Sequence, residues 1–218
     1  MHLFIYCAGG FGKEVIDIAR GIQRTRLRWN NIAFLDDCRA DAMVYGAQVF
    51  RLDAALQRFG SANMEAVIAT GEPFVRGLLD QKLEASGVRL TTIVSEFAVV
   101  SESASLAAGC IVSPGCLVSS EAILGRNVAL VAGACVGHNV QLGDNCVVAG
   151  HVNIGGACTV GSETYLGMGA QVKQLIRIGR GAVVGMGSVV FNDIPDNVIA
   201  LGNPCRLIRP NSEKRVFP

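Results

Sequence analysis

The sequence has no CxxC pair, no apolar run of the roughly 18–20 residues that a membrane span needs, and little charge of either sign. Only 17% of its 218 residues are charged, and the formal net charge is +1. Such a balance gives no support for a nucleic-acid partner or an anionic membrane surface. Without a CxxC pair, a zinc ribbon and a dithiol redox motif are both unsupported. We therefore expect no nucleic-acid partner and no membrane span.

Aromatic residues are also scarce, at 6%, whereas aliphatic residues recur at every sixth position from Val100 to Val190. All sixteen of these positions hold Val, Leu or Ile, and eight of them are followed by Gly. A period of six fits neither an α-helix nor a coiled coil. It is typical of a parallel β-helix, in which each hexad is one short strand and a turn, and three hexads (about 18 residues) close one triangular coil.

Eight cysteines are present, and four of them share one inward position of the hexad: Cys110, Cys116, Cys146 and Cys158. A buried thiol behaves as a small hydrophobe, so we interpret them as free, packed side chains. Free thiols are typical of a reducing compartment, and we expect a cytoplasmic protein. The segment 1–6 is too short, and too soon followed by glycines, for a signal peptide.

Residues 1–95 have a different pattern, in which short apolar runs alternate with helical stretches. Strands are predicted at 3–7, 31–35 and 66–69, and helices at 13–22, 52–59 and 74–86. This alternation indicates a parallel sheet covered by helices. We predict an α/β Rossmann-like domain over residues 1–95, an all-β parallel β-helix of hexapeptide repeats over 96–194, and a C-terminal cap over 195–218.

These features together resemble a known family. A short Gly-rich βαβ region with Asp36 and Asp37 after its second strand, hexapeptide repeats and a Gly202-Asn203-Pro204 tail are similar to bacterial sugar O-acyltransferases of the sialic-acid O-acetyltransferase type. The most similar members N-acetylate nucleotide-linked amino sugars, such as UDP-4-amino sugars and GDP-perosamine. The resemblance implies a left-handed β-helix, although the general crossover rule favours the right hand. It also implies a homotrimer with acetyl-CoA as co-substrate and active sites at subunit interfaces.

His138, one of three histidines, falls in the turn part of a hexad, where its side chain projects outward. Acetyl transfer needs a group that accepts a proton near neutrality, and histidine suits that role. The resemblance places the family's catalytic base at this position. We expect the acceptor to attack the thioester directly while His138 removes its proton, with the oxyanion held by backbone N–H groups.

Relatives usually carry Asp or Glu after this histidine, and this chain has Asn139 instead. An amide oxygen can accept a hydrogen bond from Nδ1 and fix the tautomer, but it adds no charge. An amine acceptor demands less of its base than a hydroxyl, so Asn139 favours N-acetylation slightly over O-acetylation. The structural alternative is that Asn139 is simply a good turn residue.

Residues about 18 apart lie above one another on an edge of the prism, which stacks His138 on Gly156 and Met168 on Met186. Relatives contact acetyl-CoA at the positions of the two methionines, and several have a second histidine at the position of Val147. The expected cofactor-binding set is therefore Val147, Gly156, Met168 and Met186. The alternative for the methionines is exposure at turns or packing in the trimer seam.

A glycine-rich turn follows the first strand and opens a helix, so its N–H groups can meet a phosphate. It lacks G-x-G-x-x-G, and one βαβ unit is small for a dinucleotide, which argues against an NAD-dependent enzyme. The resemblance implies a nucleotide sugar instead, with the two aspartates near its base or ribose. A purely structural tight turn is the alternative. The expected substrate-binding residues are Gly9, Gly10, Phe11, Gly12, Asp36, Asp37 and Gly71.

The leading interpretation is an acyltransferase, an acetyl-CoA-dependent N-acetyltransferase that acts on a nucleotide-linked amino sugar for surface polysaccharide or glycan precursor synthesis. Two alternatives stay open: a sugar O-acetyltransferase of the sialic-acid type, and a non-catalytic hexapeptide scaffold. A carbonic-anhydrase type of metal enzyme needs three converging histidines, and the prism holds only His138 and His151. No metal is expected.

Overall fold

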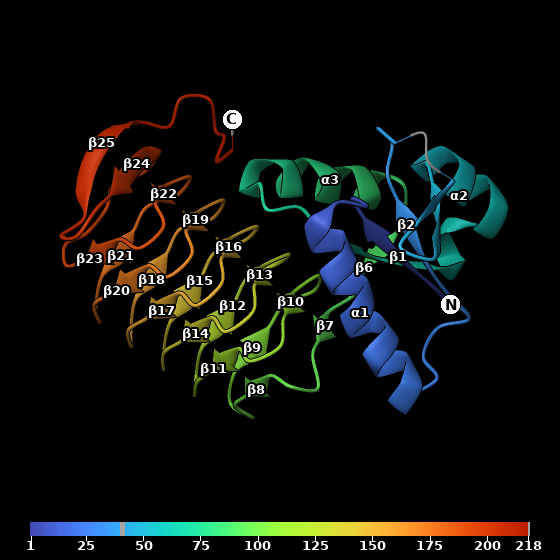
Figure 1. The fold of residues 1–218 in the computed structure, drawn as a ribbon, viewed down its shortest axis with the longest axis horizontal. Helices are drawn as coiled ribbons and strands as arrows, with labels where there is room; N and C mark the ends of the chain where they lie inside the picture. Colours follow the sequence, from blue (N-terminus) through green and yellow to red (C-terminus); the bar gives the residue numbers. More distant parts are fainter. Residues whose placement is uncertain (40–41, 218) are drawn as a thin grey trace.

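The chain folds into an α/β unit followed by a prism of stacked coils (Figure 1). This computed structural model describes residues 1–39 and 42–217. The predicted combination of a Rossmann-like domain with a parallel β-helix is confirmed. Within the described residues, no helix is long and apolar enough to cross a membrane.

The α/β unit is built on a six-stranded sheet of order β3-β4-β2-β1-β5-β6, in which only β3 runs antiparallel to its neighbour. Its strands are β1 (His2–Tyr6), β2 (Asn31–Leu35), β3 (Met43–Val44), β4 (Ala47–Phe50), β5 (Met64–Ile68) and β6 (Arg89–Leu90). Its helices are α1 (Gly10–Thr25), α2 (Leu52–Phe59) and α3 (Pro73–Ala85), with a 3₁₀ turn at Ser61–Asn63. The β3–β4 hairpin was not predicted.

The central strand β1 is buried on both faces, and its alternating side chains enter two different cores. Leu3 and Ile5 pack with α1, whereas Phe4 and Tyr6 pack with residues of α2 and α3. Helix α3 begins at Pro73, whose missing N–H costs nothing in a first turn. The chain leaves that helix through Gly87, at φ +71°, a conformation that favours glycine.

The prism has three faces of short strands, and between residues 93 and 190 each strand pairs in parallel with the one 18 residues away, as in Ile111↔Ala129 and Leu117↔Cys135. The first face holds β7 (Ile93–Val94), β10 (Ile111–Val112), β13 (Ala129–Leu130), β16 (Val147–Val148), β19 (Tyr165–Leu166), β22 (Val183–Val184), β24 (Val198–Leu201) and β25 (Arg206–Pro210). The second holds β8 (Val99–Val100), β11 (Leu117–Val118), β14 (Cys135–Val136), β17 (Asn153–Ile154), β20 (Gln171–Val172) and β23 (Val189–Val190). The third holds β9 (Ser105–Leu106), β12 (Ile123–Leu124), β15 (Gln141–Leu142), β18 (Thr159–Val160) and β21 (Arg177–Ile178).

The aliphatic residue of each hexad points into the prism, as the period of six predicts, and from Val112 onward these residues form a continuous buried core. The cysteines of the hexad pack there as free thiols. Burial raises the pKa of the Cys146 thiol to about 12, so it stays protonated and unreactive at neutral pH.

Glycines after the aliphatic residue are required by close approach rather than by φ. A Cβ built on Gly143 would lie 2.5 Å from the backbone nitrogen of Ser162 on the next coil. Positive φ instead falls at the third turn position, for example at Asn139 (58°) and His151 (56°).

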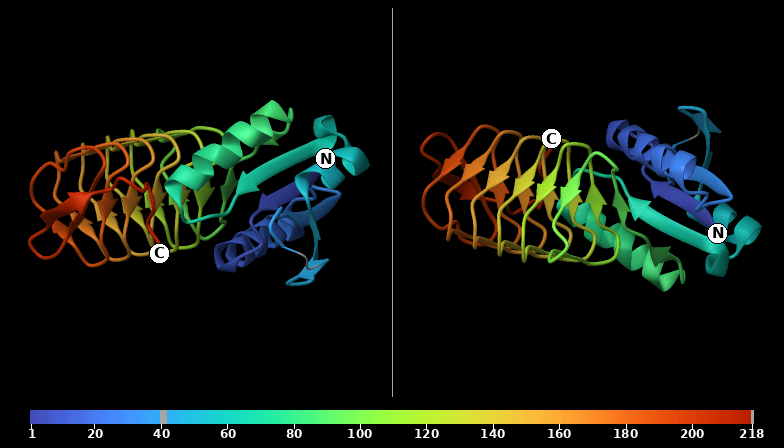
Figure 2. Two further views of the ribbon diagram at one scale, coloured as in Figure 1. Left: turned by 90° about the horizontal axis from the view of Figure 1, so that it is seen from above. Right: turned by 90° about the horizontal axis from the view of Figure 1, so that it is seen from below.

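The α/β unit lies at the end of the prism where the coils begin (Figure 2). Outward residues of the first face, including Ile111 and Ala129, join the core beneath α1. The fully buried Arg76 of α3 donates to the main-chain and side-chain oxygens of Asn127 in the prism, at 2.7–3.0 Å. Strand β7 starts at Ile93, slightly before residue 96, and it already belongs to the prism.

The C-terminal segment closes the far end of the prism and then returns along it. Strand β24 extends the first face in parallel with β22, and β25 adds an antiparallel edge. The last residues run back to the start of α3 (Figure 1). The Glu72 carboxylate there accepts the backbone N–H groups of Val216 at 2.9 Å and Phe217 at 2.8 Å.

Candidate active site

His138 lies on the edge between the second and third faces, in the turn that joins β14 to β15. We call the turns 119–122, 137–140, 155–158 and 173–176 the histidine edge. Both His138 and Asn139 are exposed, and His138 Nδ1 lies 3.0 Å from Asn139 Oδ1. The prediction that the amide oxygen holds Nδ1 therefore has the required geometry. Among the described residues, Nε2 has no hydrogen-bond partner, so it is free to face a substrate.

Glu121 lies one coil before Asn139 on the same edge, and sequence reasoning missed it. The Asn139 Nδ2 group donates to Glu121 Oε2 at 2.5 Å. The signal was available in the repeat, because residues 18 apart stack. The sequence prediction applied this stacking to His138 and not to Asn139.

Gly156 lies one coil after His138, as the repeat predicts. A Cβ built on Gly156 would come within 2.4 Å of His138 Nε2, so the imidazole ring occupies the space that a side chain at 156 would take. The next residue, Ala157, donates its N–H to the His138 carbonyl at 2.8 Å. The structure thus brings together the predicted pair.

Met168 and Met186 lie on a different edge, between the first and second faces. We call the turns 131–134, 149–152, 167–170 and 185–188 the methionine edge. The two side chains are 57% and 73% exposed, and the backbone bond from Gly187 N–H to the Met168 carbonyl, 2.8 Å long, confirms that they stack. A whole face of the prism separates them from His138 of the same chain.

Val147 is not available to a cofactor in this structure. It is only 1% exposed, because its side chain points outward from the first face into the core beneath α1, together with Ala129 and the partly buried Phe11. The expected contact rested on a position where relatives carry histidine. In this chain the α/β unit covers that position.

The glycine-rich turn lies at the carboxyl end of β1 and contains residues with different roles. A Cβ on Gly9 or Gly10 would meet nothing within 4 Å, whereas one on Gly12 would lie 2.1 Å from the Cys7 carbonyl oxygen. Gly12 is therefore structural, and the first two glycines form an exposed approach to the N-terminus of α1. That helix has no acidic residue in its first turn, which leaves its positive end open to an anion.

Asp36 and Asp37 follow β2 at the same sheet edge. Asp36 accepts the N–H groups of Ala8 and Cys38, both at 3.0 Å, and so shapes the glycine-rich turn. Asp37 accepts from the Tyr6 hydroxyl, from Lys82 Nζ at 2.5 Å and from the Leu52 N–H at 2.9 Å. Burial alone would raise the pKa of Asp37, but the bonds from Lys82 and Tyr6 outweigh it and lower that pKa.

Gly71 follows β5, whose pairing with β1 brings it beside the glycine-rich turn. The ring of Phe217 lies against it, 3.3 Å from the place of a Cβ on Gly71. The same ring meets Tyr165 edge-on, with centroids 5.7 Å apart. Sequence reasoning did not foresee that the C-terminal end reaches this edge.

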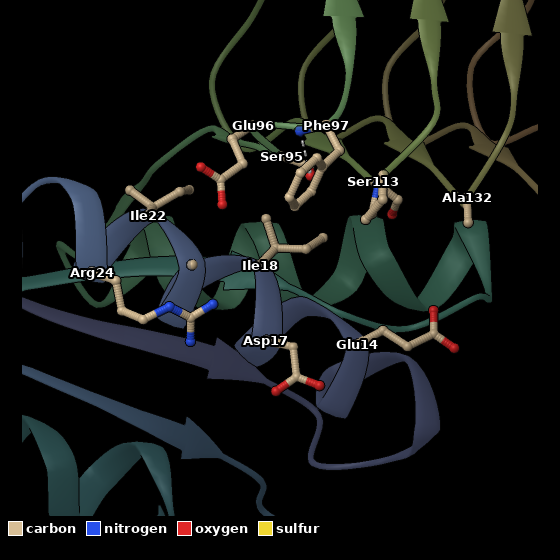
Figure 3. Close-up of a pocket in the computed structure, with 12 residues that line it drawn as sticks. Glu14, Asp17, Ile18, Ile22, Arg24, Ser95, Glu96, Phe97, Ser113 and Ala132 are labelled. Carbon is tan, nitrogen blue, oxygen red and sulfur yellow. Dashed lines mark hydrogen bonds between the residues drawn. The ribbon is translucent and has the colours of Figure 1, made fainter.

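A cavity of about 370 Å³ lies between α1 and the first coils (Figure 3). Ile18, Ile22 and Phe97 form much of its apolar wall, with Glu14 and Asp17 on the helix side. Its prism side includes Pro114 and Ala132, which lie below Met168 and Met186 in the same column. It is separate from the glycine-rich turn, and sequence reasoning missed it.

Comparison with solved structures covers nearly the whole chain. PerB from Caulobacter crescentus, solved in complex with CoA and GDP-perosamine, is 30% identical over 95% of this chain and 97% of that one, with a TM-score of 0.87. This chain belongs to the PerB family of left-handed β-helix acetyltransferases. The acetyltransferase domain of PglB from Neisseria gonorrhoeae, in complex with acetyl coenzyme A, is 28% identical over 95% of this chain and 98% of that one, with a TM-score of 0.88.

Three further matches cover parts of this PerB-family chain. A family model described as the PglD N-terminal domain matches residues 2–83. A putative acetyltransferase of Saccharomyces cerevisiae is 54% identical over 39 residues, 18% of this chain and 20% of that protein. The galactoside O-acetyltransferase of Lactococcus lactis is 56% identical over 34 residues, 16% of each chain. The matches therefore span about a fifth or less of these curated relatives.

The family predicted from the sequence is confirmed for this PerB-family chain. In the described part of the chain, no group of three or more His, Cys, Asp or Glu side chains is placed to hold a metal ion.

Proposed function

We propose that this protein transfers the acetyl group of acetyl-CoA to the amino group of a nucleotide-linked amino sugar. The observation that carries the proposal is the similarity to PerB over 95% of the chain, since that protein was solved with CoA and GDP-perosamine. The free cysteines fit a reducing compartment, and we place the protein in the cytoplasm.

The nucleotide sugar would bind at the carboxyl ends of β1, β2 and β5, where open α/β sheets bind ligands. The exposed glycines Gly9 and Gly10 let a diphosphate approach the first turn of α1, whose N–H groups and dipole favour negative charge. Phe11, Gly12, Asp36 and Asp37 shape the surrounding wall. Gly71, which follows the neighbouring strand β5, would border the same ligand.

His138 is the proposed general base, with Nε2 as the atom that accepts the proton. Asn139 accepts from Nδ1, which keeps that nitrogen protonated and leaves the lone pair on Nε2. As the amine nitrogen forms its bond to the acetyl carbon and the carbon–sulfur bond breaks, the amine proton passes to Nε2. The CoA thiolate leaves and the product is an amide.

A complete site requires a second copy of the chain, because the histidine and methionine edges lie apart on one prism. We propose a homotrimer in which the methionine edge of one subunit faces the histidine edge of the next, with acetyl-CoA between them. Met168 and Met186 offer exposed, adaptable apolar side chains for the cofactor arm, and Gly156 leaves room beside His138. Val147 has no part in this arrangement.

The test is the release of CoA thiol from acetyl-CoA in the presence of UDP-, dTDP- and GDP-linked 4-amino sugars. We expect turnover on at least one of them and a loss of about 10² to 10⁴-fold in the His138→Ala variant. Thermal melts of His138→Ala beside the wild type separate the loss of a base from a loss of folding. No turnover on any amino sugar, or full turnover without the His138 imidazole, would contradict the proposal.

A further inference from the structure

We infer that Glu121 is a positioning residue, which acts through Asn139 to hold the His138 ring in its base-competent tautomer. The three side chains form a single line along the histidine edge: Glu121 Oε2 accepts from Asn139 Nδ2 at 2.5 Å, and Asn139 Oδ1 lies 3.0 Å from His138 Nδ1. The catalytic part of this inference rests on the proposed function, whereas the tautomer itself does not.

The chemistry of the three groups sets the direction of the line. A carboxylate only accepts hydrogen bonds, so the Asn139 group that faces Glu121 must be its NH₂. The amide oxygen then has to face His138, and it can only accept. Nδ1 must therefore carry the proton, and the lone pair is left on Nε2. Without a fixed acceptor at position 121, the Asn139 amide is free to rotate so that its NH₂ group faces His138. The ring would then be protonated on Nε2 instead of Nδ1.

Backbone geometry holds Glu121 in register with Asn139. Both residues have φ of 58° at the same point of the hexad, one coil apart. The Glu121 N–H donates to Ser103 Oγ at 3.1 Å, and the Asn139 N–H donates to the Ser120 carbonyl at 3.0 Å. The carboxylate thus starts from a fixed backbone position directly below the amide.

Glu121 also supplies the negative charge that Asn139 lacks. In this chain the acid lies one coil away instead of beside the histidine, and the amide carries its orienting effect to the ring. The effect of a substitution at position 139 should therefore depend on which residue occupies position 121. An aspartate at 139 would orient His138 by itself, but it would face the Glu121 carboxylate at hydrogen-bond distance.

The first readout is the His138 tautomer in the intact protein without substrates, measured from the ¹⁵N chemical shifts of labelled histidine. We expect the Nδ1–H form in the wild type and a shift towards the Nε2–H form in Glu121→Gln. Glu163→Gln is the matched control, since Glu163 occupies the same hexad position with φ of 60° but bonds Arg180 on another edge. An unchanged tautomer in Glu121→Gln would overturn the inference.

The second readout is kcat, with KM for the amino sugar followed alongside. We expect Glu121→Gln to lower kcat by about 10-fold, a part of the roughly 10² to 10⁴-fold that a general base contributes, without a matching rise in KM. Asn139→Asp alone should lower kcat, because the new carboxylate faces Glu121. In the Glu121→Gln background, the same substitution should restore most of the lost kcat. Purely additive effects of the two substitutions on kcat would contradict the proposal that Glu121 acts through Asn139. A wild type that acetylates no amino sugar would instead refute the proposed function, and the tautomer would still decide the role of Glu121.

Discussion

The imidazole ring of His138 lies over Gly156, with Nε2 2.4 Å and Cε1 2.5 Å from the place that a Cβ on residue 156 would take. Real Cβ atoms do not approach other atoms so closely, so the glycine and the ring position are coupled. An exposed ring can move away at little cost in stability. Its movement would carry Nε2 away from the amine of the bound amino sugar.

Gly156→Ala is therefore expected to separate activity from stability. We expect kcat to fall by about 10²-fold, because a shift of about 1 Å in a catalytic group can cost that much. The free energy of unfolding should change by only about 0.5 kcal/mol, as for most surface substitutions. Thiol-release kinetics and thermal melts measure the two effects, and the same substitution in a His138→Ala background gives the stability without the clash. Wild-type kcat in Gly156→Ala would show that the ring does not depend on this glycine.

Two arginines at the junction of the α/β unit and the prism are expected to contribute unequally to the free energy of unfolding. Arg76 is fully buried, and its partners among the described residues are neutral oxygens, those of Asn127, Ile68 and Thr70, at 2.5–3.2 Å. Burial lowers the pKa of its guanidinium to about 10, so it remains charged at neutral pH. Arg76→Met would leave several buried oxygens without partners, each at a cost of about 1–3 kcal/mol.

The Arg126–Asp80 pair is the matched comparison. Arg126 forms a two-bond ion pair with Asp80, at 2.7 Å for each bond, and Asp80 is buried. Removing one partner would leave a buried charge unpaired, so the comparison replaces both, as Arg126→Met with Asp80→Leu, a change that is often nearly neutral. Denaturant unfolding should therefore show a loss of about 3 kcal/mol or more for Arg76→Met and a much smaller one for the double variant. Equal losses would contradict this account of the junction.

The six-residue period explains why the prism and its stacked residues could be predicted from the sequence. It fixes which residues point inward and which stack, so the pairing of His138 with Gly156 and of Met168 with Met186 followed from position alone. The three faces share one hexad, however, and nothing in the repeat says which face the α/β unit covers. For this reason the burial of Val147 was not foreseen.

Long-range contacts of single side chains were equally out of reach. Arg76 lies in a helix of ordinary amphipathic pattern, and only the docked prism makes its position a buried one. Phe217 reaches Gly71 because the C-terminal end folds back over the prism, a path that no local pattern encodes. Glu121 was within reach of the stacking rule, because position 121 lies 18 residues before Asn139.

The Glu72 carboxylate is expected to hold the C-terminal end against the α/β unit. It accepts two backbone N–H groups, from Val216 and Phe217, and bonds to a charged acceptor are about twice as strong as neutral ones. Glu72→Gln should raise the hydrogen-exchange rates of those two amides by about 10-fold, equivalent to about 1.4 kcal/mol, while amides of β1 keep their rates. Unchanged exchange at 216 and 217 would mean that the carboxylate does not hold this segment.

Asp37 should make the α/β unit sensitive to acid. Its folded-state pKa is lowered by the bonds from Lys82 and Tyr6, against the opposing effect of burial. A lowered folded-state pKa means stability that is present above the unfolded value of about 3.9 and is lost as the pH falls through the folded value. Thermal melts should show Asp37→Asn less stable than the wild type at pH 7, with the difference shrinking below about pH 4. A difference that grows in acid would contradict this sign.

The proposed sharing of one site by two subunits predicts complementation. His138→Ala subunits keep an intact methionine edge, and subunits with Met168→Glu and Met186→Glu keep an intact histidine edge. Each variant alone should release little CoA, because all its interfaces lack one half of the site. When the two are co-expressed, mixed trimers contain interfaces where an intact histidine edge meets an intact methionine edge, so thiol release should reappear. Mixing the two purified proteins without subunit exchange is the control. Activity that stays absent in purified mixed trimers would place the two edges in separate sites and refute the shared arrangement.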